Sequence, residues 1–94
     1  MAVNVRIPVL LRSLTQNQGE VSVEGSTVKE VIEQLEAKFP GIQERLYDEE
    51  GKLRRFINIY VNSEDIRSQQ GEETAVKDGD EISIVPAIAG GLGA

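Results

Sequence analysis

Chemistry in this chain is best sought at its end, in the nine residues PAIAGGLGA from Pro86 to Ala94. A strand-like run, EISIVP, stops at Pro86 and is followed by small side chains and the pair Gly90-Gly91. A chain end of this kind either frays, as many termini do, or enters a narrow site on another protein. Glycine suits the second role, because a backbone without Cβ adopts dihedral angles closed to other residues.

Few side chains are available for catalysis or for metal binding. The chain of 94 residues has no histidine and no cysteine, so the commonest general base and the commonest thiol nucleophile are both absent. A disulfide is excluded and a zinc site is disfavoured, which leaves carboxylate and backbone oxygens for hard cations. The motif Asp78-Gly79-Asp80 lacks the rest of a twelve-residue calcium loop and predicts a turn. We therefore expect no catalytic residue and no metal site.

The formal net charge of −6, from 16 acidic and 10 basic residues, argues against two classes of partner. An acidic chain is repelled by phosphate backbones and by anionic lipid, so neither nucleic acid nor a membrane is expected as a partner. No apolar run approaches the roughly 20 residues of a membrane helix. The apolar part of the opening MAVNVRIPVLLRS is too short for a signal peptide and is interrupted by Arg6 and Pro8, which indicates a cytoplasmic protein.

The elements that must position the tail begin with two strands. In the segment 3–11 (VNVRIPVLL), apolar and other residues alternate, which predicts a strand with one inward face formed by Val3, Val5, Ile7 and Val9. Turn residues follow. The segment 20–25 (EVSVEG) alternates in the same way and predicts the hairpin partner of the first strand.

The strongest helix prediction starts at Thr27, which stands three residues before Glu30 at the spacing of a capping box. In such a box the two side chains satisfy exposed backbone amides reciprocally. The apolar stripe of the helix recurs at helical spacing and consists of Val28, Val31, Ile32 and Leu35. Pro40-Gly41 ends the helix, and a short helical turn over 42–46 is expected after it.

The remaining segments complete the pattern of one sheet and one helix. A third strand is predicted over 54–62, a short edge strand around Ile66, and a turn leading into the last strand over 77–86. One apolar helix stripe and several strands with one apolar face each predict a mixed sheet of about five strands packed on one main helix. This is an α+β fold of the ubiquitin-like, or β-grasp, type over residues 1–86, with a flexible C-terminal tail at 87–94. A ferredoxin-like sandwich would need a second long helix, which the pattern lacks.

Two longer motifs point to a known family. They are RFINIYVNSEDIR at 55–67 and the closing DGDEISIVPAIAGG at 78–91, with a capped helix between two hairpins. In these features the chain resembles the MoaD/ThiS family of ubiquitin-like sulfur carriers, and the likeness extends to Gly91. The opening RIPVLLR and the approach GKLRRF to the third strand resemble the carriers of cysteine biosynthesis within that family.

The resemblance implies a carrier that is not an enzyme and that works through the carboxylate of Gly91. An adenylating enzyme of the MoeB/ThiF type would use ATP to form an acyl-adenylate there, and sulfide or a persulfide would displace AMP to leave a thiocarboxylate. ATP and the sulfur donor thus come through that partner, and no cofactor is bound by the chain itself. The residues expected to enter the partner's active site are Ala87, Ile88, Ala89 and Gly90.

The last three residues depart from the family pattern. Carriers that work directly end in Gly-Gly, whereas here Leu92-Gly93-Ala94 follow Gly91. A protease, such as a JAMM-type metallopeptidase, would have to cut between Gly91 and Leu92 before charging. Alternatively, the three residues are not native, or this member has left sulfur chemistry and serves as a binding module. We favour trimming.

A candidate docking face is formed by Arg54, Arg55, Phe56 and Tyr60. If the apolar residues of the third strand pack on the helix, Phe56 and Tyr60 lie on the open face of the sheet. Aromatic residues are enriched in binding patches, and the two arginines would orient an acidic partner. An exposed aromatic pair that only stabilises cross-strand contacts is the alternative. The resemblance favours docking, because carriers of this family dock through the open sheet face.

The sulfur acceptor stays open between three hypotheses. The thiocarboxylate would serve a cysteine synthase in the first and the large subunit of molybdopterin synthase in the second. In the third, the chain is a ubiquitin-like modifier or interaction domain whose glycine end forms amide bonds to lysines. We expect the free protein to be a monomer.

Overall fold

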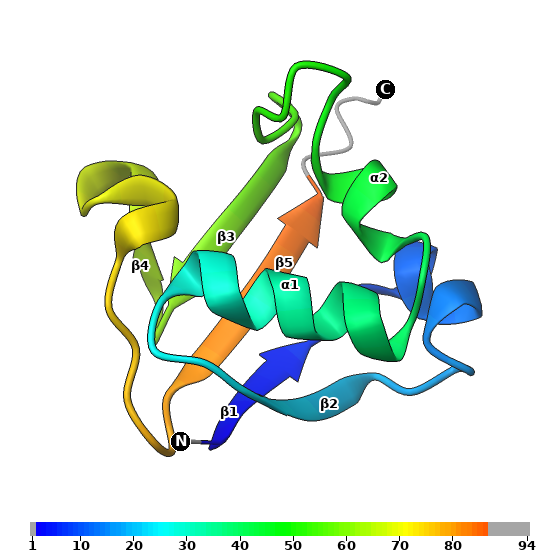
Figure 1. Cartoon of the computed structure of the whole chain (residues 1–94), viewed down its shortest axis with the longest axis horizontal. Helices are drawn as coiled ribbons and strands as arrows, with labels where there is room; N and C mark the ends of the chain where they lie inside the picture. The colour runs from blue at the N-terminus through cyan, green and yellow to red at the C-terminus, as the bar shows by residue number, and fades with distance from the viewer. Residues whose placement is uncertain (1, 87–94) are drawn as a thin grey trace.

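The computed structural model describes residues 2–86 and places five strands in one mixed sheet with the order β2-β1-β5-β3-β4 (Figure 1). The two strands at the centre, β1 (Ala2–Arg6) and β5 (Glu81–Pro86), are parallel to each other. On either side of them, β2 (Glu20–Glu24) and β3 (Ile57–Val61) pair antiparallel with their neighbours. The outermost strand, β4 (Glu64–Asp65), is only two residues long. The predicted hairpin and mixed sheet are confirmed.

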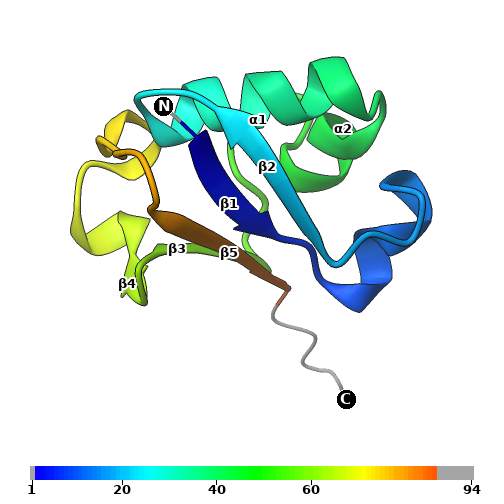
Figure 2. The ribbon, with the colours of Figure 1, turned by 90° about the horizontal axis from the view of Figure 1, so that it is seen from below.

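Helices cover one face of this sheet and leave the other open (Figure 2). The main helix α1 (Val28–Lys38) packs across the strands, and the short α2 (Ile42–Leu46) follows it. The described part of the chain also has three short 3-10 helices: η1 (Val9–Leu14), η2 (Ile66–Ser68) and η3 (Gly71–Glu73). The arrangement is the expected α+β β-grasp, with one main helix on a five-stranded mixed sheet.

The core lies between α1 and the sheet. The inward residues of the strands are apolar and almost fully buried, and the predicted apolar stripe of α1 is buried in full. The largest side chains with less than 2% exposure include Ile7, Ile32, Leu35, Ile42, Leu46, Ile59, Ile66 and Ile82. Such close packing holds the body rigid and leaves the outer sheet face to solvent. No helix in the described part of the chain has the length and apolar character to cross a membrane.

At the start of α1, one of the two hydrogen bonds of the predicted capping box is present, and the other has a different partner. Thr27 Oγ1 accepts a hydrogen bond from the backbone N–H of Glu30 at 3.2 Å, as predicted. The Glu30 carboxylate reaches one residue further back, where it accepts from the backbone N–H and the hydroxyl of Ser26 at 2.9 and 2.8 Å. These two hydrogen bonds hold the pKa of Glu30 below its ordinary value, and the bond from the backbone N–H of Ser26 has the larger effect.

The first strand is shorter than predicted. β1 ends at Arg6, and Val9 begins the 3-10 helix η1 with 74% of its surface exposed, so the expected inward position of Val9 is wrong. The physical reason is Pro8, which lacks an N–H for the strand ladder and fixes φ at −69° before the turn. Leu11 becomes the buried residue of this segment in place of Val9. The edge strand near Ile66 is present as β4, directly before that residue, and Ile66 itself is buried in η2.

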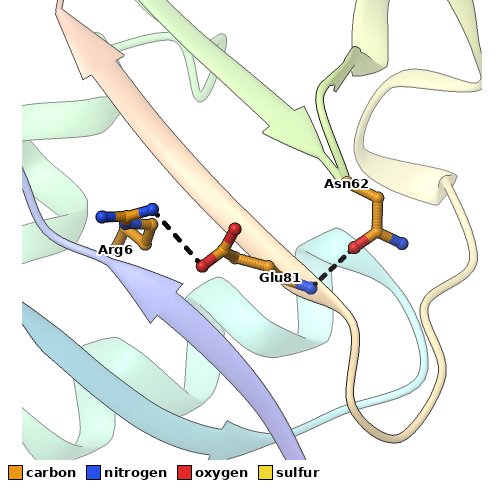
Figure 3. A network of polar contacts seen from close by, with 3 residues as sticks. All are labelled: Arg6, Asn62 and Glu81. Atoms are coloured by element: carbon orange, nitrogen blue, oxygen red, sulfur yellow. Dashed lines mark hydrogen bonds and ion pairs between the residues drawn. The ribbon is translucent and has the colours of Figure 1, made fainter.

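A small polar network ties the three inner strands together on the open face (Figure 3). Arg6 of β1 and Glu81 of β5 form an exposed ion pair at 3.6 Å, and Asn62 after β3 accepts a hydrogen bond from the backbone N–H of Glu81 at 3.0 Å. Asn62 also donates to the Asp80 carboxylate, which is the first cause of the lowered pKa of Asp80. Because Asp78-Gly79-Asp80 is thus committed to the turn before β5, the predicted turn is confirmed.

Candidate functional site at the end of strand β5

The site begins where β5 ends, at Pro86, in the middle of the sheet. Pro86 pairs with Ile57 at the start of β3, and Ser83 pairs with Arg6 near the end of β1. The approach to β3 therefore lies beside the point from which the tail departs, while β1, the other neighbour of β5, ends opposite Ser83, three residues earlier along β5. The predicted tail residues lie outside the described part of the chain and stay predictions: Ala87, Ile88, Ala89, Gly90, Gly91 and Leu92.

Exposed apolar side chains gather at this same end of the sheet. Among residues 2–86, four large apolar side chains are strongly exposed, and we call them the exit patch: Val9 at 74%, Leu10 at 60%, Phe56 at 54% and Val85 at 41%. Phe56 and Val85 lie next to the Ile57–Pro86 pair at the end of β5, and Val9 and Leu10 begin η1 in the connection that follows β1. Since exposed apolar groups that cluster mark interaction sites more often than scattered ones do, the exit patch is the best candidate surface for a partner.

Basic residues stand near the exit patch in this acidic protein. Arg6 lies on the open face beside β5, and Arg55 is exposed directly before Phe56. Arg67 covers the outer edge of β3 by donating to the carbonyl oxygen of Ile57 at 2.9 Å and to the side chain of Asn58. A partner with an apolar centre and acidic surroundings would match this composition.

The four residues of the predicted docking face have different surroundings. Phe56 belongs to the exit patch, and Tyr60 lies on the outward side of β3 opposite Ser83. Arg55 is exposed, but Arg54 donates to the carbonyl oxygen of Glu44 in α2 at 3.1 Å and so is directed toward the helices. The structure thus brings Phe56 and Arg55 to the exit patch, places Tyr60 further along the strand, and holds Arg54 against α2.

Sequence reasoning missed three members of the exit patch, namely Val9, Leu10 and Val85. The first two were assigned to a strand, although Pro8 before them was a signal that the strand ladder would stop. Val85 was missed because only the inward residues of the last strand were considered. Its place between the buried Ile84 and Pro86 puts it on the open face.

An open cleft of about 870 Å³ lies elsewhere, on the helix-bearing side, and is lined by charged residues of both signs from α1, α2, the loop after α2 and η3. Tyr47 is the aromatic residue among those that line it. Burial is the main cause that raises the pKa of the Tyr47 hydroxyl, and a hydrogen bond with Glu72 is the second. A phenol held protonated in this way cannot act as a base near neutral pH. Within residues 2–86, no group of three or more carboxylates is placed to hold a metal ion.

Comparison with known proteins gives a consistent result. The model of the ThiS family matches residues 5–91. The sulfur carrier protein CysO of Mycobacterium tuberculosis (strain ATCC 25618 / H37Rv) is 53% identical over 93 residues, which is 97% of this chain and 100% of the relative. A chain in the crystal structure of the Amycolatopsis orientalis BexX/CysO complex is 50% identical with a TM-score of 0.88, covering 95% of this chain and 99% of that one. Small archaeal modifier protein 3 of Haloferax volcanii is 36% identical over 66 residues, covering 70% of this chain and 71% of the relative.

Proposed function

We propose, from the premise that this chain belongs to the ThiS family and is a sulfur carrier and not an enzyme, that it carries sulfur as a thiocarboxylate on Gly91. The family match ends at residue 91, the second glycine of the pair. The single observation that carries the proposal is this match. The strand β5, which ends at Pro86 in the middle of the sheet, five residues before Gly91, is consistent with it.

The chemistry requires an activated main-chain carboxylate, because no thiol is present in the chain. The Gly91 carboxylate attacks the α-phosphate of ATP on a MoeB/ThiF-type adenylating enzyme, and pyrophosphate leaves. Sulfide then attacks the acyl carbon and displaces AMP, which leaves the thiocarboxylate. If a persulfide of the partner is the nucleophile, AMP leaves and an acyl disulfide forms, and a second thiol of that partner then cleaves the S–S bond to release the thiocarboxylate and form a disulfide in the partner. Ala87, Ile88, Ala89 and Gly90 form the stretch that enters the partner, and their small size fits a narrow channel.

Docking of the body is assigned to the exit patch together with Arg55 and Tyr60. An apolar centre supplies most of the binding free energy, and the arginines orient an acidic partner and speed its approach. The CysO protein of Amycolatopsis orientalis was crystallised in complex with BexX, which supports a stable docking mode for a close relative. A role for Arg54 in docking stays a prediction and requires that it release the carbonyl of α2.

The acceptor that we favour is a cysteine synthase, because the similarity to CysO covers nearly the whole chain. The large subunit of molybdopterin synthase and a lysine of a modified protein are the competing acceptors. We further propose that a JAMM-type metallopeptidase removes residues 92–94 before charging, and that the protein works in the cytoplasm.

The test is an intact-mass measurement after co-expression of the full chain with an adenylating enzyme and a sulfide source. We expect a species that ends at Gly91 with one oxygen replaced by sulfur. As a matched control, a chain shortened to residues 1–91 should be charged without any protease. The same shortened chain with Gly91→Pro should not be charged. An amide adduct on lysines in place of the thiocarboxylate would support the modifier hypothesis and overturn the carrier.

A further inference from the structure

The two edges of the sheet are protected to different degrees. On one side β4 is only two residues long and is followed by η2, and Arg67 covers the neighbouring carbonyl of Ile57. On the other side β2 is a regular five-residue strand, and no other strand within residues 2–86 covers its far edge (Figure 1). Long regular edges pair readily with further strands unless charge or a bulge prevents it.

The register identifies which backbone groups of β2 point outward. Ala2 and Asn4 of β1 exchange backbone hydrogen bonds with the segment at Gly79 and Asp80, so their amides and carbonyls face β5. Ser22 is the partner of Asn4 in the β1–β2 ladder and therefore faces away from β1. Its carbonyl oxygen accepts a 3.4 Å hydrogen bond from the Lys38 ammonium, which confirms the outward direction.

Charge selects the kind of strand that can add here. Acidic side chains, Glu20 and Glu24, stand at the two ends of β2, with the small Ser22 between them. A second copy paired antiparallel about Ser22 would bring Glu20 of each copy opposite Glu24 of the other, which is unfavourable twice over. A strand that carries lysine or arginine opposite Glu20 would instead meet a carboxylate at that end of β2.

We propose that the outer edge of β2 is a docking site for an extended, basic segment of a partner protein, bound by strand addition. Backbone hydrogen bonds to Ser22 supply the pairing, and Glu20 supplies the preference for positive charge. In the free protein the Lys38 ammonium occupies the carbonyl oxygen of Ser22 through a long hydrogen bond. When the strand binds, a backbone N–H of that strand replaces the ammonium as the donor to this oxygen. Because β1 lies between β2 and β5, a segment bound at this edge leaves Val85 and the end of β5 uncovered.

The test uses a capped eight-residue peptide of alternating lysine and valine, titrated into 15N-labelled protein of full length. We expect saturable shifts confined to β2 and the end of α1, and none with a peptide of alternating glutamate and valine. Ser22→Pro removes the outward N–H without touching the ladder to β1 and weakens binding about tenfold, whereas Ser22→Ala, the matched control, leaves it unchanged. Lys38→Ala removes both the closing bond and a like charge, so it strengthens binding.

A second variant keeps the outcome clear if Ser22→Pro disturbs the fold. Glu20→Lys leaves the backbone unaltered and weakens binding of the basic peptide at low salt, with the effect falling as salt rises. The proposal is overturned if the basic peptide does not bind, if its shifts lie on the exit patch, or if Ser22→Pro folds and binds normally. Dimers of the protein joined through β2 in sedimentation would also overturn it, in favour of a second copy as the occupant.

Discussion

The exit patch is tested most sharply by replacing its two most exposed members, Val9 and Leu10, with serine. Burial of a valine or leucine side chain contributes about 1.5–3 kcal/mol, and the exposures of 74% and 60% leave about two thirds of each side chain for a partner to cover. The double variant should therefore lose about 2–4 kcal/mol of binding free energy, which weakens affinity for the adenylating enzyme about 30- to 850-fold. Folding should change by no more than about 0.5 kcal/mol, because neither side chain is in the core.

Isothermal titration of the variant against a MoeB/ThiF-type enzyme measures this loss, and thermal unfolding checks the fold. Glu49→Ser combined with Glu50→Ser, in the exposed loop after α2, is the control for two serine substitutions far from the patch. Unchanged affinity in a folded Val9→Ser, Leu10→Ser variant would refute docking at the exit patch. A loss of affinity in the control of similar size would show that the assay does not report on this surface.

Three further expectations concern the body of the protein. Thr27→Ala removes the N-cap bond of α1 and should cost about 1 kcal/mol, seen as a fall of about 4–8 °C in the melting temperature. Gly25→Ala places a Cβ 2.8 Å from the Cγ2 atom of Val31 and should lower the free energy of unfolding, measured in urea, by about 1–3 kcal/mol. An unchanged free energy of unfolding would mean that the backbone at Gly25 can shift without loss of stability. The raised pKa of Tyr47 means that the protonated phenol contributes stability that is complete below about pH 10 and is lost as pH rises above it. Tyr47→Phe should therefore flatten the fall of the urea midpoint at alkaline pH. An unaltered fall would mean that other groups cause the alkaline loss of stability.

Local patterns were enough to predict most of the scaffold. The capping residue Thr27 and the 3.6-residue spacing of the α1 stripe act within one helix, and alternation in β3 reports its buried face directly. The mixed sheet packed on one main helix follows because one helix and one sheet have few compact arrangements, whereas the spatial order of the strands comes from the structure. These features depend on neighbours in sequence, so a single chain is sufficient to see them.

The exit patch could be predicted only in part, because it depends on neighbours in space. The alternation of the third strand predicts Phe56 as an exposed aromatic residue, whereas the alternation around Val9 and Leu10 is that of an ordinary strand and does not show that Pro8 ends β1. The direction of Arg54 toward α2 follows from the path of the loop between α2 and β3, which no local pattern specifies.

The central claim is that sulfur is carried on the main-chain carbonyl of Gly91, and fragmentation mass spectrometry of the charged protein tests it most directly. The protein of residues 1–91 is incubated with an adenylating enzyme, ATP and sulfide, and is then fragmented intact. We expect the mass increase of a single oxygen-to-sulfur exchange in the fragments that contain Gly91 and in no others. Sulfur located on any other residue, or an adenylated Gly91 that never accepts sulfur, would contradict it.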